Sequence, residues 1–429
     1  VASFYEKIRG VVDWREEHLL RKTAIERILK RRIFTRTQGE DFSEPFLQEL
    51  IRGGHFPNES IPQRKITEIQ QIIAKYLFLL EHTPKDAANK LLVKVQDWLL
   101  GIAAAEVEET LISSRRERAL IDFMTESIEQ DVVIKNGTAL SQEDKHIQVF
   151  VAIQRALFKL DDATISYHLF EKLYPFWKNQ DQETLSAIAE KICVLYEKIR
   201  DILSHPLSEK LYQLAEQFDT AFLLIGDIIM ANPDDFLELA QDPVKLEIAM
   251  KEAYTVRLGK LQGKMHRAAF YGTLSVFLSK VLIAIAAEVP FDKYITHEFN
   301  MTALGISVTV PPLLMLLLVT SITTSSEENF QKVMLEVMRI TYVTDKRNIH
   351  ELASPKKRGV VLNTVINATY LASFVLTFGF LFLVLKGLSF STLSSIVFLL
   401  FVSLITFGGT RIRQRGAELL IGEQKQGFL

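Results

Sequence analysis

The fold is decided by residues 359–410, GVVLNTVINATYLASFVLTFGFLFLVLKGLSFSTLSSIVFLLFVSLITFGGT, in which Lys386 is the only charged side chain. A single helix of these 52 residues would be ~78 Å long at ~1.5 Å per residue, more than twice the ~30 Å hydrocarbon core of a bilayer. The stretch must therefore fold back on itself. Gly387 is the expected hinge, because glycine readily adopts the left-handed conformation that ends a helix.

Two further stretches of low charge precede this one. Residues 268–287 contain one charged side chain, Lys280, and residues 301–324 contain none. Each is long enough to cross a bilayer, which takes ~20 apolar residues. Wholly soluble, collagen-like, disulfide-stapled and mostly disordered chains are therefore excluded. We expect an integral membrane protein, with the lipid bilayer as its first partner and four spans in two helical hairpins, at about 268–289, 301–324, 359–385 and 388–410.

Basic residues flank these spans unevenly. Sixteen Lys and Arg lie in residues 251–267, 325–358 and 411–429, whereas only Lys293 and Lys386 lie on the opposite side. Cytoplasmic loops of membrane proteins carry the excess of Lys and Arg. Both termini are therefore predicted to be cytoplasmic, in a plasma or inner membrane, with residues 325–358 as a cytoplasmic loop.

Residues 1–242 have the pattern of a water-soluble helical domain. Residues 1–267 hold 36 basic and 42 acidic side chains, whereas residues 268–429 hold 14 and 10, so the overall charge of −2 averages two unlike regions. Apolar residues recur every three or four positions, as on one helix face, most clearly at Leu185, Ile188, Ile192, Leu195, Ile199 and Ile202. Only Val132–Ile134 hints at a strand. We therefore predict an all-α fold, with an N-terminal multi-helix cytoplasmic domain followed by a four-helix transmembrane region.

A helix is predicted to begin at Asp242-Pro243, where a capping side chain precedes a first-turn proline. No strong helix breaker follows before Pro290, so residues 243–267 are expected to form a helical stalk that runs into the first span. The transmembrane domain then covers residues 268–410, and residues 411–429 form a cytoplasmic tail. Because the chain begins with valine and ends on an apolar pair, we expect one or both ends to be truncated.

Lys280 is the most informative single residue. It is the thirteenth of the twenty residues 268–287, and a charge this deep costs at least ~2.5–3.5 kcal/mol on insertion. A transport or gating role fits it, and the structural alternatives are a buried pair with a neighbouring helix or a shallow first span that lies partly in the interface. Glu288 lies eight residues on, ~12 Å along a straight helix, so the two are expected to pair directly only if the helix bends or another subunit supplies the partner.

Two further intramembrane features complete the candidate polar site. Pro311 and Pro312 lie at the centre of the second span, where each removes an amide donor and clashes with the carbonyl four residues back, so a kink or break is expected. Asn363 and Asn367 share one face of the third span, as side chains that hydrogen-bond between membrane helices do. Broken spans form substrate sites in transporters; a plain kink and packing asparagines are the structural alternatives.

The basic run of Lys30, Arg31, Arg32 and Arg36 ends an amphipathic helix. It is a candidate for contact with anionic lipid headgroups, at ~1 kcal/mol per basic residue, and a solvated helix end is the alternative. The middle of the N-terminal region is acidic, which argues against a nucleic-acid partner. The single cysteine, Cys193, cannot form an internal disulfide.

No motif in the chain fixes a reaction or a ligand. A His-Glu-x-x-His zinc helix, a phosphate-binding loop, a dinucleotide fingerprint, a nucleophile elbow and the kinase motifs are all absent from the sequence. We therefore expect no catalytic residues, no metal and no cofactor, and an enzyme is the least favoured class.

The favoured function is a membrane-anchored helical scaffold or regulatory protein, whose large cytoplasmic domain binds a protein partner. The alternative is an oligomeric channel or transporter that uses Lys280 and the Pro311-Pro312 helix break. A path through the membrane would then need a homo-oligomer, because four spans seldom enclose one alone.

Overall fold

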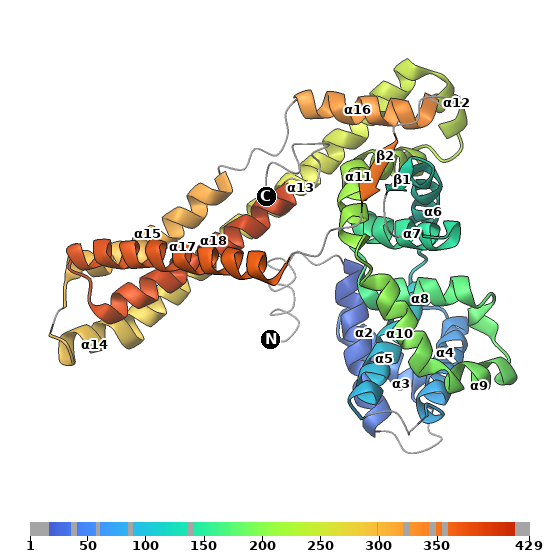
Figure 1. The fold of residues 1–429 in the computed structure, drawn as a ribbon, viewed down its shortest axis with the longest axis horizontal. Coiled ribbons are helices and arrows are strands. Elements are labelled where there is room, and N and C mark those ends of the chain that lie inside the picture. The colour runs from blue at the N-terminus through green and yellow to red at the C-terminus, as the bar shows by residue number, and fades with distance from the viewer. Residues whose placement is uncertain are drawn as a thin grey trace. The chain divides into compact units, whose positions relative to one another are not determined.

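The computed structural model describes residues 17–35, 41–56, 61–84, 89–135, 140–297, 299–320, 327–342, 349–353 and 359–416. The chain divides into two compact units. The N-terminal unit comprises Val1–Met230 and Val337–Ser354, and the membrane unit comprises Ala231–Glu336 and Pro355–Leu429. Helices dominate both units (Figure 1), which confirms the predicted all-α class.

The N-terminal unit is built around one central helix. Its helices are α2 (Glu17–Thr35), α3 (Ser43–Arg52), α4 (Gln63–Glu81), α5 (Asn89–Leu111), α6 (Arg115–Glu129), α7 (Gln142–Phe158), α8 (Asp162–Leu173), η1 (Trp177–Asn179), α9 (Gln182–Glu190), α10 (Ile192–Leu203) and α11 (Ser208–Ala231). Helix α5 packs against α2, α4, α8 and α10, and its residues 99–108 are buried on every side. Gly101 lets α8 come close, since a Cβ there would lie 2.9 Å from the Cβ of Ala163.

Several helices begin where the sequence offers a capping side chain. Ser141, Asp161 and Asp181 each accept a hydrogen bond from the backbone N–H three residues on, at 3.0, 3.0 and 2.7 Å. Asp242 caps a helix in the membrane unit in the same way, with Pro243 in its first turn. The predicted helix start at Asp242-Pro243 is therefore confirmed.

The apolar stripe from Leu185 to Ile202 belongs to two helices rather than one. The chain leaves helical geometry at Lys191, which separates α9 from α10. Leu185, Ile188, Ile192 and Ile199 nevertheless all lie buried in the core of the N-terminal unit.

Two short parallel strands form a sheet within the N-terminal unit. Strand β1 (Val132–Lys135) pairs with β2 (His350–Ala353), with Val132 opposite His350. Lys135 Nζ lies 2.5 Å from the Glu351 carboxylate on the neighbouring strand. Residues 325–358 are predicted to form a cytoplasmic loop. Of its described residues, the last turns of α16 and strand β2 belong to the N-terminal unit, where the pairing satisfies the backbone groups of β2.

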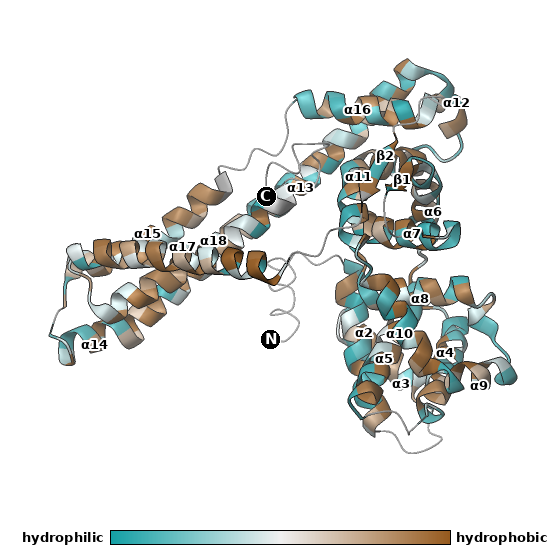
Figure 2. Cartoon of the chain, viewed as in Figure 1, coloured by the Kyte–Doolittle hydropathy of each residue, from teal (hydrophilic) through white to brown (hydrophobic). Residues whose placement is uncertain are grey.

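The membrane unit contains the long apolar helices. Its elements are α12 (Phe236–Gln241), α13 (Pro243–Ile283), the π turn η2 (Ala284–Glu288), α14 (Val289–Tyr294), α15 (Met301–Thr320), α16 (Glu327–Tyr342, whose last turns count with the N-terminal unit), α17 (Val360–Gly387) and α18 (Thr392–Gly416). Four helical stretches are long and apolar enough to cross a membrane, namely Pro243–Tyr294, Met301–Leu318, Val360–Gly387 and Thr392–Arg413. Figure 2 shows hydrophobic residues along α15, α17 and α18.

Three of these helices pack on one another, and the fourth packs mainly against one of them. Helices α13, α15 and α18 contact each other pairwise, and α17 contacts α18. Leu385 is the only buried residue found on α17 within the described part of the chain. A helix that exposes apolar residues on all sides suits a lipid environment.

The turn between α17 and α18 differs from the expected glycine hinge. Gly387 is the last residue of α17, and the left-handed residue is Ser389, with φ 62°. The N–H groups of Ser389 and Phe390 donate to the carbonyls of Lys386 and Leu385 at 3.0 and 3.1 Å, the pattern of a Schellman motif. The prediction that Gly387 is the left-handed residue is therefore wrong, because the motif places that position two residues later.

Candidate functional site: a polar cluster among the spanning helices

Lys280 and Glu288 form an ion pair inside the membrane unit. Both side chains are fully buried, and Lys280 Nζ contacts Glu288 Oε1. Eight α-helical residues would rotate Glu288 ~80° away from Lys280, at ~3.6 residues per turn. Residues 284–288 instead form a π turn, which holds an extra residue and returns Glu288 to the face of Lys280. From the sequence, direct pairing within one chain was expected only if the helix departs from a straight α-helix, and the π turn is such a departure.

Glu288 is the centre of a polar cluster drawn from several helices. Its Oε2 accepts hydrogen bonds from Ser307 of α15 and Ser394 of α18, both at 3.3 Å. Lys280 Nζ also lies 5.3 Å from the ring centroid of Phe401 on α18, within the range of a cation–π interaction. The cluster therefore ties α13, α15 and α18 together through polar contacts between stretches that are mostly apolar.

Asp292 joins the cluster from α14, one helical turn after Glu288. Its Oδ2 accepts a hydrogen bond from Ser394 at 3.0 Å. Its Oδ1 is buried, and no described residue donates to it. Asp292 was not predicted from the sequence, because it lies beyond residue 289, where the first span was expected to end. Its spacing of four residues from Glu288 was the available signal, since residues at that spacing share a helix face.

Pro311 and Pro312 lie inside α15, which continues as one helix from Met301 to Thr320. The helix does not break at the prolines, although the carbonyls of Ser307 and Val308 lose the amide donors that a regular helix would supply. Ser307, one turn before Pro311, is the residue of α15 that reaches the polar cluster.

Asn363 and Asn367 lie on α17, and both are exposed. Neither side-chain amide is hydrogen-bonded to another residue in the described ranges. The structure therefore does not bring these asparagines into the cluster around Glu288, to which α17 contributes no residue of those described.

The structure describes three of the four predicted lipid-contact residues, namely Lys30, Arg31 and Arg32, whereas Arg36 lies outside the described residues. Lys30 Nζ lies 2.5 Å from the Asp97 carboxylate, and both arginines contact Glu49, Arg32 at 2.9 Å. Burial by itself would raise the pKa of Glu49, but hydrogen bonds from the two arginines lower that pKa below its ordinary value. Because these three basic side chains already form ion pairs within the chain, the run has less positive charge available to bind lipid headgroups.

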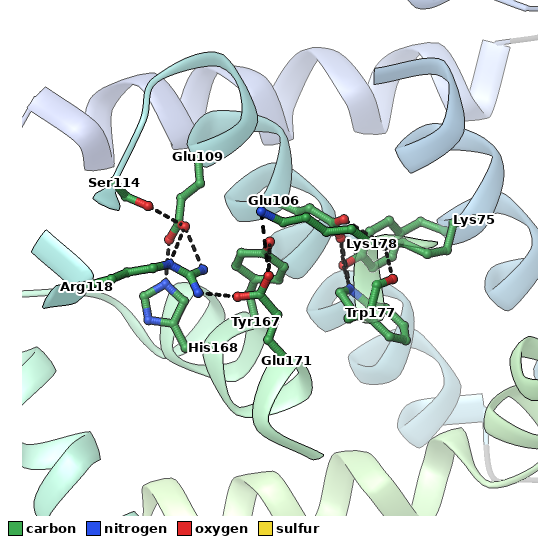
Figure 3. A network of polar contacts seen from close by, with 11 residues as sticks. Lys75, Glu106, Glu109, Ser114, Arg118, Tyr167, His168, Glu171, Trp177 and Lys178 are labelled. Atoms are coloured by element: carbon green, nitrogen blue, oxygen red, sulfur yellow. Dashed lines mark hydrogen bonds and ion pairs between the residues drawn. The ribbon is translucent and has the colours of Figure 1, made fainter. Parts of the chain in front are cut away.

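A second buried cluster, in the N-terminal unit, has no counterpart in our sequence analysis (Figure 3). Glu106 of α5 is fully buried and accepts hydrogen bonds from Lys75 at 2.7 Å, Tyr76 at 2.7 Å and the Trp177 indole at 2.9 Å. Burial and the charge of Glu106 raise the pKa of Tyr76 well above its ordinary value, so its hydroxyl keeps the proton that it donates.

Glu109, one turn further along α5, has its own set of donors (Figure 3). Ser114 donates at 2.7 Å and Arg118 at 2.7 and 2.9 Å to one oxygen, while His168 contacts the other. Burial alone would raise the pKa of Glu109, but the hydrogen bond and charge of His168, with the charge of Arg118, lower it to about 2.

All four carboxylate oxygens of Glu106 and Glu109 therefore have donors, which leaves this cluster little capacity to bind a substrate. The signal in the sequence was the position of Glu106 within the apolar run of α5. No group of three or more His, Cys, Asp or Glu side chains in the described ranges could hold a metal ion. Comparison with protein families, with curated proteins and with solved structures finds no match to this chain.

Proposed function

We propose that the chain is a membrane-anchored scaffold or regulatory protein. Its N-terminal unit is the platform that binds a protein partner, and its four spans are the anchor. The proposal combines the four apolar helices with an N-terminal unit whose buried carboxylates are occupied by internal donors.

The observation that carries this proposal is the ion pair between Lys280 and Glu288. A charge within a membrane helix is expensive and marks a functional site by default. Here the lysine and the glutamate neutralise each other inside one chain, where α13, α15 and α18 meet. This arrangement supports an anchor with a closed interior over a conduit that would present Lys280 to a passing solute.

The paired strands support the proposed topology. Strand β1 precedes the first two candidate spans in the chain and β2 follows them. Two hydrogen-bonded strands must lie on one side of a bilayer, so the pairing favours an even number of crossings between them. With the excess of Lys and Arg on that side, we infer that this side is cytoplasmic and that both termini lie there.

Phe176 supports the interaction role of the N-terminal unit. It is 86% exposed and has a left-handed backbone, with φ 66°, a conformation that costs a bulky residue about 1–3 kcal/mol. The neighbouring Trp177 is buried and bonded to Glu106, which fixes the chain beside it. Exposed aromatic residues held in place in this way are typical anchors of protein interfaces.

The deciding experiment is reconstitution of the full chain in liposomes, with flux of Na⁺, K⁺, Cl⁻ and H⁺ recorded. We expect no flux above empty liposomes, either for the wild type or for the double variant Lys280→Leu with Glu288→Leu. Flux in the wild type that the double variant abolishes would overturn the scaffold proposal in favour of the channel or transporter.

Partner binding is tested by co-purification from the native host. We expect a partner that co-purifies with the wild type and with Phe34→Ser to be lost from Phe176→Ser. Phe34 is a matched control, because it is also an exposed phenylalanine of the N-terminal unit, at 68%. Equal loss in both variants would count against Phe176 as the anchor of the interface.

A further inference from the structure

The Asp292 carboxyl group is buried, and the rest of the polar cluster bonds only one of its oxygens. Its side chain is 8% exposed, and its Oδ1 has no hydrogen-bond donor among the described residues. Its Oδ2 lies 3.0 Å from Ser394 Oγ, so the carboxylate points into the cluster. A buried ionised carboxylate without compensation is strongly unfavourable.

The cluster contains two carboxyl groups and one described lysine. Lys280 pairs with Glu288, and no cationic side chain in the described ranges forms an ion pair with Asp292. The nearest basic residue in sequence, Lys293, is exposed and lies 5.7 Å over the ring of Tyr294. An Asp292 carboxylate would therefore have no ion-pair partner among the described residues.

The Ser394 hydroxyl group cannot donate a hydrogen bond to both carboxylates of the cluster. Ser394 Oγ lies within hydrogen-bond distance of both Glu288 Oε2, at 3.3 Å, and Asp292 Oδ2, at 3.0 Å. A serine hydroxyl has one proton and can donate to only one of them at a time. At the carboxylate that does not receive this proton, a lone pair of the serine oxygen faces a lone pair of the carboxylate oxygen. A cation bound between these two oxygens would replace their repulsion by attraction to the cation.

We propose that Asp292, Ser394 and Glu288 form a binding site for one small monovalent cation of the sodium type. The candidate ligands are all oxygens, from two carboxylates and a hydroxyl, and oxygen is the ligand that hard cations prefer. Because Lys280 already matches one carboxylate, the site suits a single positive charge rather than two. The inference rests on the geometry of the cluster and holds whether or not the N-terminal unit is a scaffold.

The test is equilibrium binding of radioactive Na⁺ to the purified full chain in detergent at neutral pH. We expect saturable binding of one ion per chain, which Asp292→Asn abolishes. Ser394→Ala is expected to raise the half-saturating Na⁺ concentration about tenfold or more, the usual effect of losing a supporting group at a metal site. Ser403→Ala is the matched control, since its exposed hydroxyl lies on the same helix and bonds to its own backbone; it should bind Na⁺ as the wild type does.

Melting of the helices, followed by far-UV circular dichroism, separates loss of the site from loss of the fold. In choline chloride, Asp292→Asn should melt at or above the wild-type temperature, because a neutral amide at this position needs no counter-charge. In sodium chloride the wild type and Ser403→Ala should gain stability and Asp292→Asn should not, as a ligand that binds the folded state requires. Absence of saturable Na⁺ binding by the wild type, or equal binding by Asp292→Asn, would overturn the proposal and leave a proton as the remaining compensation.

Discussion

The two buried ionic clusters of this chain differ in the number and kind of their hydrogen-bond donors. In the N-terminal unit, Glu106 and Glu109 receive lysine, arginine, histidine, tyrosine, serine and indole donors, so that every carboxylate oxygen is satisfied. In the membrane unit, Glu288 and Asp292 share one lysine and two serines. One oxygen of Asp292 receives no donor from the described residues.

The difference follows from the surroundings of the two carboxylate pairs. The N-terminal unit draws its donors from many polar side chains, and each buried charge can be met by several of them. A spanning helix admits few charged groups, because each one must be inserted into an apolar medium. A carboxylate in the membrane unit therefore depends on one partner, and losing that partner should have a larger effect there.

The largest expected effect comes from replacing Lys280, the positively charged side chain of the membrane cluster. Lys280→Leu leaves the Glu288 carboxylate buried without its partner and should destabilise the chain by about 3–5 kcal/mol. Lys280→Leu combined with Glu288→Leu should recover most of this loss, because the desolvated charges are both removed. The free energy of unfolding in mixed micelles with sodium dodecyl sulfate measures both effects. A double variant that is no more stable than the single one would show that the unpaired Glu288 carboxylate is not the cause of the loss.

Acid should weaken the N-terminal cluster through Glu109. Its pKa in the folded chain, about 2, lies below the ordinary value of 4.5. The stabilisation by this carboxylate is therefore complete above pH ~4.5 and is lost as the pH falls towards ~2, in total about 3 kcal/mol. Urea unfolding of the full chain, followed by tryptophan fluorescence at decreasing pH, should show this loss.

Glu109→Gln should flatten that part of the acid dependence. Glu190→Gln, at an exposed position, should leave it unchanged. An unaltered acid dependence in Glu109→Gln would show that another group carries it.

Glycine-to-alanine substitutions compare how tightly the two units are packed. A Cβ at Gly101 would lie 2.9 Å from the Cβ of Ala163, which cannot move without its helix, whereas a Cβ at Gly409 would lie 2.8 Å from Leu318 Cδ1, the end of a flexible side chain. Alanine gains about 1 kcal/mol over glycine in a helix, and overpacking costs about 1–3 kcal/mol. Gly101→Ala should therefore destabilise by up to about 2 kcal/mol, and Gly409→Ala should be neutral or stabilising. Unfolding midpoints in urea and in denaturing detergent measure both effects. A larger loss of stability in Gly409→Ala than in Gly101→Ala would show that the membrane helices are the more tightly packed pair.

The smallest expected effect is at the turn between α17 and α18. Ser389 has a left-handed backbone, so Ser389→Gly should stabilise the membrane unit by about 0.5–1 kcal/mol. Ser403→Gly, in the interior of α18, should destabilise it by a similar amount. Thermal melting of the two variants in one detergent gives the comparison, and equal shifts of the same sign would argue against the Schellman turn.

The parts of the fold that depend on short-range physics could be predicted from the sequence. The spans follow from the thickness of a bilayer, and the start of α13 follows from Asp242 and Pro243 side by side. Lys280 stood out for the same reason, since one charge in a long apolar stretch is visible without any structure.

The parts of the fold that depend on helix register or on contacts between distant residues could not be predicted from the sequence. A single π turn at 284–288 changes which residue Lys280 meets, and no residue type specifies such a turn. The partner of Val132–Lys135 lies more than two hundred residues away, in β2. The donors of Glu106 come from α4 and η1, which only tertiary packing brings together.

The central claim is that the N-terminal unit, including β2, lies on one side of the membrane and that α14 reaches the other. Single cysteines at Ile295, which is 67% exposed, and at Glu351, in a chain with Cys193→Ser, test it in sealed right-side-out vesicles with an impermeant thiol reagent. We expect Ile295→Cys to be labelled at once and Glu351→Cys only after the vesicles are opened. Labelling of both positions in sealed vesicles would contradict the account.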